Sequence, residues 1–175
     1  YGAKVPFIRP DELSTDYAGT IPVIKHAIEW VEDNNNSIEN VCCLYATAPF
    51  IQSKTIYKAY QQLKNSKVDY CFSVTSFAFP IQRAIKIIHN NTVSMFYPEF
   101  FSTRSQDLEE SYHDAGQFYW GKARAFKDEL QIFSEVSVPY ILPRYLVQDI
   151  DTIEDWTRAE IMYRVLQEAN NTTIE

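Results

Sequence analysis

The chain has 175 residues, of which 46% are hydrophobic, so it can bury a substantial core within one domain. Lys and Arg number 16 against 23 Asp and Glu, and the net charge of -7 argues against duplex nucleic acid or anionic lipid as the main partner. No apolar run reaches the length of about 18 residues that a membrane span needs, and no signal segment is visible. We therefore expect no membrane association.

Three cysteines lie in apolar runs. Cys42 and Cys43 are adjacent and Cys71 stands alone, so the CxxC spacing of a zinc site is missing. An odd number of cysteines suits reduced, buried thiols better than a disulfide framework. These thiols predict a cytoplasmic location.

The expected elements begin with a helix over 19–33, where apolar residues recur at helical spacing and Pro22 suits a first turn. The continuous apolar run at 41–45 has the pattern of a buried parallel strand that ends near 47–49. Ser53 is expected to cap a helix that reaches Lys64. The first part of the chain therefore alternates between helix and strand.

The later elements continue this alternation. Segments 83–88 and 93–96 are expected to pair as strands around a turn at Asn90 and Asn91. Further strands are expected at 69–74, 118–120, 138–142 and 147–150, and further helices at 123–130 and 153–169. This order predicts an α/β layered domain with a largely parallel sheet, and residues 72–97 look like an inserted antiparallel arm.

Asp149 and Asp151 are the strongest candidates for metal ligands. Two residues apart on an extended backbone, their side chains would share one face with Cα atoms about 6.6 Å apart. Mg²⁺ takes one or two protein carboxylates together with phosphate oxygens and water, so this D-x-D suits nucleotide chemistry. The alternative is a helix capping box that starts at Asp151 and includes Glu154.

An anionic ligand would need placed arginines because the net charge repels it. The candidates are Arg9, Arg83, Arg104 and Arg144. Arg104 could grip a carboxylate in fork geometry, or it could pair with Asp107 or Glu109 instead.

Two further alternatives concern single side chains. Arg83 is either a phosphate or carboxylate contact or an exposed charge of the arm. His113 beside Asp114 could form an acid–base pair, although adjacent strand residues face apart and a lone His is more often structural.

Six motifs occur in a fixed order along the chain. They are Arg9-Pro-x-Glu-Leu-Ser-x-Asp16, Thr47-Ala-Pro49, Pro80-Ile-Gln-Arg83, Arg104-Ser-Gln-Asp-Leu108, Asp114-Ala-Gly-Gln-Phe-Tyr119 and Asp149-Ile-Asp-Thr152. In this order they resemble the acylneuraminate cytidylyltransferases, and the pseudaminic acid cytidylyltransferases are the branch that they resemble most. The resemblance runs from Arg9 to about Gln167.

The resemblance implies a three-layer fold like that of nucleotide-diphospho-sugar transferases, in one domain over 1–175. It also implies a homodimer that exchanges an arm at about 72–101. The implied reaction joins CTP and a nine-carbon keto-sugar acid, giving the CMP-sugar and pyrophosphate with Mg²⁺ as cofactor. No nucleic acid or membrane partner is implied.

The site residues follow from the same resemblance. Asp151 would hold the metal with help from Asp149. Nucleotide-binding positions match Arg9, Thr20 and Thr47, and sugar-side positions match Tyr45, Arg83, Arg104, Gln117 and Tyr119. Tyr45 and Arg83 stand where sialic acid enzymes usually carry glutamine and lysine, which fits a different nonulosonic acid.

One family feature has no counterpart in this sequence. The family opens with a strand and a Gly/Arg/Lys-rich loop that cradles the triphosphate, whereas the four glycines here stand at 2, 19, 116 and 121. We therefore expect the chain to be truncated at its N-terminus. The alternative to an active transferase is an inactive fragment that only dimerises or binds a sugar acid.

Overall fold

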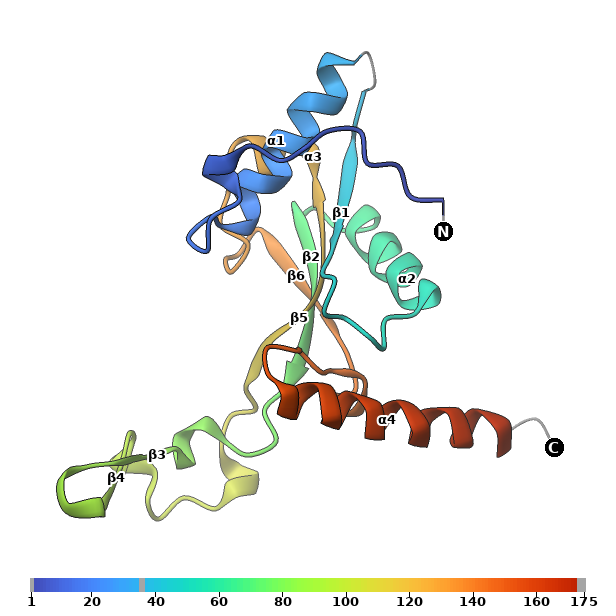
Figure 1. Cartoon of the computed structure of the whole chain (residues 1–175). Coiled ribbons are helices and arrows are strands. Elements are labelled where there is room, and N and C mark those ends of the chain that lie inside the picture. Colours follow the sequence, from blue (N-terminus) through green and yellow to red (C-terminus); the bar gives the residue numbers. More distant parts are fainter. Residues whose placement is uncertain (1, 35–36, 173–175) are drawn as a thin grey trace. The chain divides into compact units, whose positions relative to one another are not determined.

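The chain forms two compact units in the computed structural model, which describes residues 2–34 and 37–172 (Figure 1). Unit 1 comprises Tyr1–Leu44, Ser53–Phe72 and Phe118–Val138, and unit 2 comprises Tyr45–Gln52, Ser73–Gln117 and Pro139–Glu175. The two ends of the predicted 1–175 domain lie outside the described residues. That the chain forms a single domain stays a prediction.

A four-stranded sheet has the strand order β1-β5-β2-β6. Its strands are β1 (Asn40–Leu44), β5 (Tyr112–Lys122), β2 (Tyr70–Ser76) and β6 (Ser137–Ile141). Strand β5 runs antiparallel to β1. Strands β2 and β6 run in parallel, because the Tyr70 amide donates to the Val136 carbonyl and the Leu142 amide to the Val74 carbonyl. The α/β class is confirmed, but the sheet is mixed and not largely parallel as the alternation of elements predicts.

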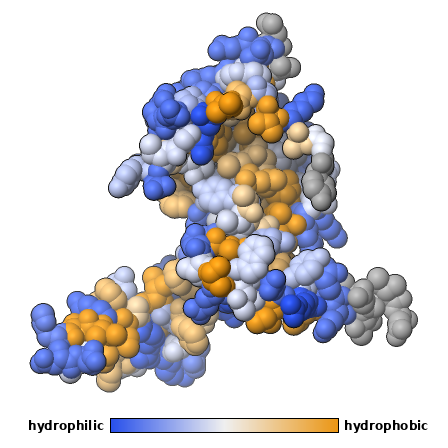
Figure 2. Space-filling view, in the orientation of Figure 1, coloured by the Kyte–Doolittle hydropathy of each residue, from blue (hydrophilic) through white to orange (hydrophobic). Residues whose placement is uncertain are grey.

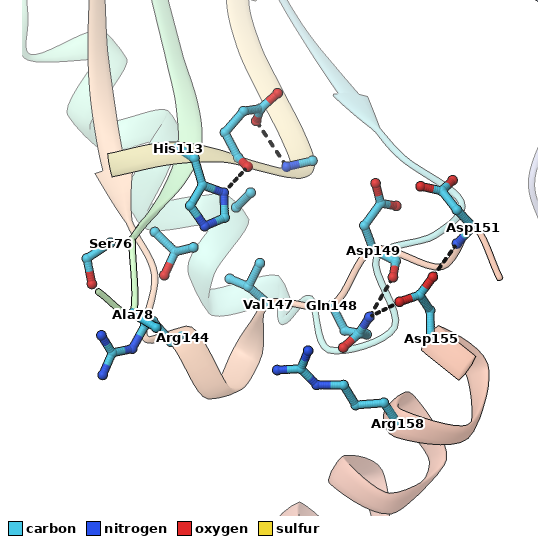
Figure 3. Close-up of a pocket in the computed structure, with 14 residues that line it drawn as sticks. Ser76, Ala78, His113, Arg144, Val147, Gln148, Asp149, Asp151, Asp155 and Arg158 are labelled. Carbon is cyan, nitrogen blue, oxygen red and sulfur yellow. Dashed lines mark hydrogen bonds between the residues drawn. The ribbon is translucent and has the colours of Figure 1, made fainter. Parts of the chain in front are cut away.

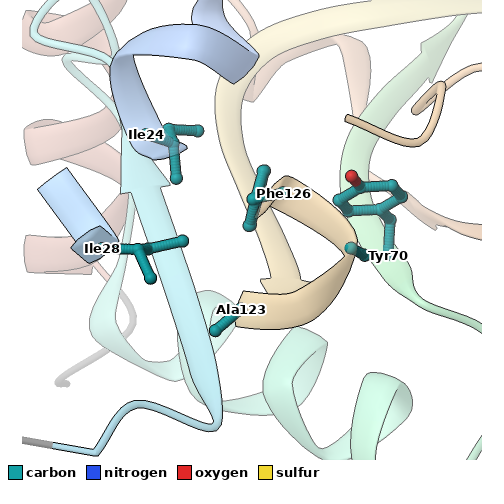
Figure 4. Close-up of a cluster of buried hydrophobic side chains, with 6 residues drawn as sticks. Ile24, Ile28, Tyr70, Ala123 and Phe126 are labelled. Atoms are coloured by element: carbon teal, nitrogen blue, oxygen red, sulfur yellow. The ribbon is translucent and has the colours of Figure 1, made fainter. Parts of the chain in front are cut away.

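The core of unit 1 lies between helices α1 (Thr20–Asp33) and α3 (Ala123–Lys127) and strand β2. Ile24 and Ile28 of α1 are buried in one cluster with Tyr70 and Phe126, whose rings meet edge to face at 5.0 Å (Figure 4). Gly19 stands at the N-cap of α1. The helix predicted over 19–33 is therefore confirmed, and its apolar face is the one that packs.

Strand β1 differs from its prediction as a buried parallel strand. It stands at one end of the strand order, pairs antiparallel with β5, and is only half-buried over Asn40–Cys43. The short apolar run could not distinguish a central strand from a half-covered one. The cysteines are free, and only Cys71 is fully buried. Burial raises the pKa of the Cys42 and Cys71 thiols to about 12, so both are protonated at neutral pH.

Helix α2 (Ser53–Lys64) ends where predicted, begins at Ser53 itself, the residue predicted to cap it, and buries Ala59 and Leu63. Helix α4 (Ile153–Thr172) begins where predicted. Short 3-10 helices occur at Asp11–Leu13, Ile81–Arg83, His89–Asn91, Pro98–Phe100, Ser105–Asp107 and Arg144–Leu146. Within 2–34 and 37–172, no helix combines the length and apolar composition that a membrane span requires.

Unit 2 contains the predicted hairpin. Strands β3 (Ile85–Ile87) and β4 (Val93–Met95) pair antiparallel, and Asn90 and Asn91 between them have φ of 63° and 60°. Asn tolerates this left-handed conformation better than most residues, which is why the pair can form the turn. Figure 2 shows apolar surface over this hairpin, and its exposed large side chains include Ile85, Ile87, Val93 and Phe96.

The segment 147–150 does not form the predicted strand. Local side-chain bonds occupy its backbone instead: the Ile150 amide donates to Asp149 Oδ1 at 3.0 Å, and Gln148 Nε2 donates to the Asp149 carbonyl at 2.6 Å. Such bonds offer the backbone an alternative to a strand ladder. The strand prediction rested on the β-rich composition of the segment, which does not reveal these side-chain bonds.

Candidate active site

A pocket of about 470 Å³ lies within unit 2 (Figure 3). Its walls come from the end of β2, the beginning of β5, and the segment that leads through residues 144–151 into α4. The lining residues are Thr75, Ser76, Ala78, His113, Asp114, Ala115, Gly116, Arg144, Val147, Gln148, Asp149, Asp151, Asp155 and Arg158. Most of these carry polar or charged groups, so the pocket suits a polar ligand.

Asp149 and Asp151 both line this pocket. They do so from an irregular segment, not from the strand end on which their spacing was predicted. Gly116 of β5 lies close to Asp149, because a Cβ on Gly116 would stand 3.7 Å from Asp149 Oδ2. Gly116 also has a φ of 59°, which favours glycine. The backbone of β5 can therefore approach the first carboxylate of the D-x-D.

The N-terminus of α4 is capped by Thr152 and Asp155. The Asp155 amide donates to Thr152 Oγ1 at 3.2 Å, and the Thr152 amide donates to Asp155 Oδ2 at 3.0 Å. This reciprocal pair is a capping box. The predicted alternative, a capping box formed by Asp151 and Glu154, is therefore wrong, because Thr152 and Asp155 form the box. The Asp151 side chain is not needed for the cap.

Asp155 also ties the cap to the D-x-D segment. Its Oδ2 accepts the Thr152 hydroxyl at 2.7 Å and the Asp151 amide at 3.3 Å. Gln148, which is 6% exposed, donates from Nε2 to Asp155 Oδ1 at 3.3 Å and to the Asp149 carbonyl. These hydrogen bonds, led by that of the Thr152 hydroxyl, lower the pKa of Asp155. The carboxylate therefore stays ionised. It holds the Asp151 amide on one side of Ile150, while Gln148 holds the Asp149 carbonyl on the other side.

The donor set of the pocket fits Mg²⁺. Among the described residues there is no group of three or more His, Cys, Asp or Glu side chains that could enclose a metal ion. Mg²⁺ needs no such group, because it takes one or two carboxylates and completes its shell with water and substrate phosphates. Asp149 and Asp151 supply hard oxygen ligands of this kind, while the Asp155 carboxylate is engaged in the cap.

His113 and Asp114 do not form an acid–base pair of side chains. His113 Nδ1 lies 2.8 Å from the carbonyl oxygen of Asp114, and its ring meets Phe77 edge to face at 4.8 Å. Asp114 Oδ1 accepts the Gly116 amide at 3.0 Å. These contacts favour the structural alternative for His113, although both residues line the pocket.

The two predicted sugar-side arginines have partners within unit 2. Arg104 donates to both carboxylate oxygens of Asp107, from Nε at 2.7 Å and from Nη2 at 3.1 Å, which was the alternative considered for it. Arg83 donates to the carbonyl groups of Phe101 and Thr103, so it holds the loop that follows the hairpin. Neither side chain lines the pocket.

The other predicted site residues are distributed over both units. Arg9, Thr20 and Tyr119 belong to unit 1, where Arg9 Nε donates to Ser14 Oγ at 3.2 Å and the Tyr119 ring stacks on Phe72 at 6.1 Å. Tyr45, Thr47 and Gln117 belong to unit 2 but do not line the pocket. Gln117 is 1% exposed, and its Nε2 donates to the Leu146 carbonyl at 2.6 Å. The ligand contacts of all six residues stay predictions.

Among the polar lining residues, the sequence did not single out Thr75, Ser76, Asp155 and Arg158. Asp155 had a visible signal, because Thr152-x-x-Asp155 is a capping-box pattern one residue later than the one considered. Arg144, one of the four candidate anion contacts, does line the pocket, and its Nη1 donates to the Phe77 carbonyl at 3.3 Å.

Comparison with known proteins adds a second line of evidence. The chain is 44% identical over 169 residues to a pseudaminic acid cytidylyltransferase of Campylobacter jejuni (serotype O:2), covering 97% of this chain and 73% of the relative. It is 38% identical over 151 residues to a Helicobacter pylori protein, covering 86% of this chain and 28% of the relative. That relative is named pseudaminic acid cytidylyltransferase and UDP-2,4-diacetamido-2,4,6-trideoxy-beta-L-altropyranose hydrolase.

A more distant relative is the N-acylneuraminate cytidylyltransferase of Escherichia coli O18:K1:H7. It is 29% identical over 178 residues, covering 100% of this chain and 40% of the relative. No protein-family model matches the chain.

Proposed function

The chain belongs to the pseudaminic acid cytidylyltransferase family, and we propose that it transfers CMP from CTP to a nonulosonic acid with release of pyrophosphate. The observation that carries this proposal is the placement of Asp149 and Asp151 in one polar pocket of a chain that is 44% identical over 169 residues to such an enzyme. The transferase is therefore a nucleotidyltransferase whose phosphate chemistry is centred on the D-x-D.

Pseudaminic acid is the first acceptor to test. Relatives from two Campylobacter jejuni strains, at 44% and 43% identity, are named for this sugar acid. Relatives at 29% and 28% identity are named for N-acylneuraminate and N,N'-diacetyllegionaminic acid. All three names describe related sugar acids, which supports a nonulosonic acid as the class of acceptor. Within that class pseudaminic acid comes first, because the relatives named for it have the higher identities.

In the proposed reaction, the anomeric hydroxyl of the acceptor attacks the α-phosphorus of CTP. The new bond is between that hydroxyl oxygen and phosphorus, and the bond from the α-phosphorus to the pyrophosphate oxygen breaks. The hydroxyl proton is lost to a base or to solvent. Positioning and charge stabilisation dominate such a transfer, and no covalent enzyme intermediate is needed.

Asp149 and Asp151 would hold Mg²⁺, which when bound neutralises the phosphate oxygens and the departing pyrophosphate. Both carboxylates stand on a segment whose backbone is fixed by Gln148, Asp155 and the Thr152 cap. This segment is held before any ligand arrives, so little ordering has to accompany substrate binding.

We also propose a homodimer formed through the arm at about 72–101. The β3–β4 hairpin supports this because its exposed side chains are large and apolar, including Ile87 at 74% and Val93 at 59% exposed. A second copy would remove this surface from water. The cytoplasmic location predicted from the cysteines stays a prediction.

The test of the function is pyrophosphate release from CTP by the purified protein with Mg²⁺ and pseudaminic acid. We expect release that requires the acceptor and stops when EDTA removes the metal. A parallel reaction with N-acetylneuraminic acid should be slower. Release without acceptor would indicate CTP hydrolysis, and no release with either acid would contradict the proposal.

A further inference from the structure

Arg158 is a charged residue of the pocket to which neither the motifs nor the family comparison assigns a role. It lies in the second turn of α4, three residues after Asp155, and the same face of the helix presents both side chains. It lines the pocket together with Asp149 and Asp151. In Figure 3 its side chain extends from α4 below Gln148, toward the side of the pocket on which Arg144 lies.

Arg158 is not neutralised by its neighbour on the helix. Asp155 would be the natural partner at this spacing, but its two carboxylate oxygens already accept bonds from Thr152, Asp151 and Gln148. No ion pair joins Arg158 to a carboxylate anywhere in the described part of the chain. The side chain is exposed, so its guanidinium is accessible to a ligand in the pocket.

The charges around the pocket show why such a group is needed. Among the residues that the structure describes, four carboxylates line it, those of Asp114, Asp149, Asp151 and Asp155, together with the guanidinium groups of Arg144 and Arg158. Both proposed substrates are anionic, and the chain as a whole carries a charge of -7. An anion would therefore be repelled unless a nearby cation offset the carboxylates.

The other predicted anion contacts in unit 2 are engaged elsewhere. Arg104 is held in a fork by Asp107, and Arg83 binds loop carbonyls. Arg144 donates one hydrogen bond to the Phe77 carbonyl. Arg158 thus keeps a planar set of donors that matches two oxygens of a carboxylate or of a phosphate.

We propose that Arg158 binds an anionic oxygen pair of a substrate in this pocket, either the carboxylate of the acceptor acid or a phosphate of the nucleotide. The identity of those substrates rests on the proposed function. The two sources share one chemistry, and kinetics with each substrate varied in turn separates them.

The test compares Arg158→Gln with Arg164→Gln. Both changes remove one positive charge from α4, but Arg164 lines a separate apolar groove with Phe50, Trp156 and Tyr163. We expect Arg158→Gln to raise the KM of one substrate at least about tenfold, which corresponds to the loss of one charged hydrogen-bonded contact. Arg164→Gln should leave both KM values near those of the parent protein.

Which KM rises identifies the source of the anion. A rise for the acceptor alone assigns Arg158 to the carboxylate, and a rise for CTP alone assigns it to a phosphate. Arg158→Lys keeps the charge but loses the fork, so it should restore only part of the lost affinity. Equal KM values in Arg158→Gln, Arg164→Gln and the parent protein would overturn the proposal.

A binding measurement keeps this inference separate from the proposed function. Calorimetry with pyrophosphate alone and with pseudaminic acid alone reports affinity even if no CMP is transferred. Weaker binding of either probe to Arg158→Gln than to Arg164→Gln supports Arg158 in a protein whose turnover fails. Unchanged binding of both probes, in a protein that does turn over CTP, contradicts Arg158 and leaves the proposed function standing.

Discussion

The two halves of strand β5 serve different purposes. Residues 118–122 belong to unit 1, where Gly121 faces the rings of Tyr70 and Phe126 and a Cβ on it would come within 2.5 Å of each. Residues 112–117 belong to unit 2, where Gly116 stands beside Asp149 with a φ of 59°. One glycine is required for space and the other for backbone conformation.

This difference shows how one strand can carry both stability and chemistry. Around Gly121 the neighbours are buried rings that cannot move without loss of packing. Around Gly116 the neighbours are polar side chains of an open pocket. Changes at the first half should therefore reduce the free energy of unfolding, whereas changes near the second should act first on catalysis.

The sharpest test on the catalytic side is Asp151→Asn. The substitution keeps the shape of the side chain but removes the negative charge proposed to hold Mg²⁺, so we expect pyrophosphate release to fall at least about 100-fold. Because Asp151 contributes only its backbone amide to the cap, the melting temperature should stay within error. Turnover at the parental rate would remove the metal role from Asp151.

Gly121→Ala tests the packing half of the comparison. The new methyl group would overlap both rings, and overpacking of this kind costs about 1–3 kcal/mol. Chemical denaturation should show this loss in the midpoint. The folded fraction should keep the parental KM values, and a change in KM without a loss of stability would break the division between the two halves.

Gly116→Ala tests the other glycine. A left-handed φ costs an L-residue about 1–2 kcal/mol, although the methyl group itself has room. We expect the variant to lose stability by this amount or to shift the backbone beside Asp149, which would lower kcat. Gly116→Asn is the matched control, because Asn tolerates this conformation better and should recover part of the loss.

Thr152→Val tests the N-terminal cap of α4, in which Asp155 also holds the backbone of the D-x-D segment. It removes the hydroxyl that accepts the Asp155 amide while keeping the branched shape, so we expect a loss of about 1 kcal/mol in the free energy of unfolding. Turnover should fall more gently than in Asp151→Asn, and the Mg²⁺ concentration for half-maximal rate should rise. Thr152→Ser, which keeps the hydroxyl, should behave like the parent protein.

Arg104→Ala is expected to have only a small effect on stability. Its fork with Asp107 is exposed, and such pairs contribute about 0–1 kcal/mol. If Arg104 leaves Asp107 to bind the acceptor, the KM for the acceptor should rise more than the KM for CTP. Equal effects on both KM values would contradict its sugar-side role.

Local features of the fold could be predicted from the sequence. The helix over 20–33, the helix over 53–64 and the Asn90–Asn91 turn each depend on periodicity or on residues that tolerate a particular backbone conformation. The capping box was also local, but Asp151 and Thr152 were both acceptable first residues, and only the hydrogen bonds distinguish Thr152.

The sequence by itself therefore determined the class of fold, the main helices, the hairpin and the pair of aspartates, because each depends on residues that lie close together in the sequence. The tertiary structure decided the strand partners of β1 and β5, the engagement of Arg104 by Asp107, and the placement of Arg158 in one pocket with the D-x-D. Strand pairing joins segments that are far apart in the chain, and a pocket selects whichever side chains reach it. Neither leaves a periodic pattern in the sequence.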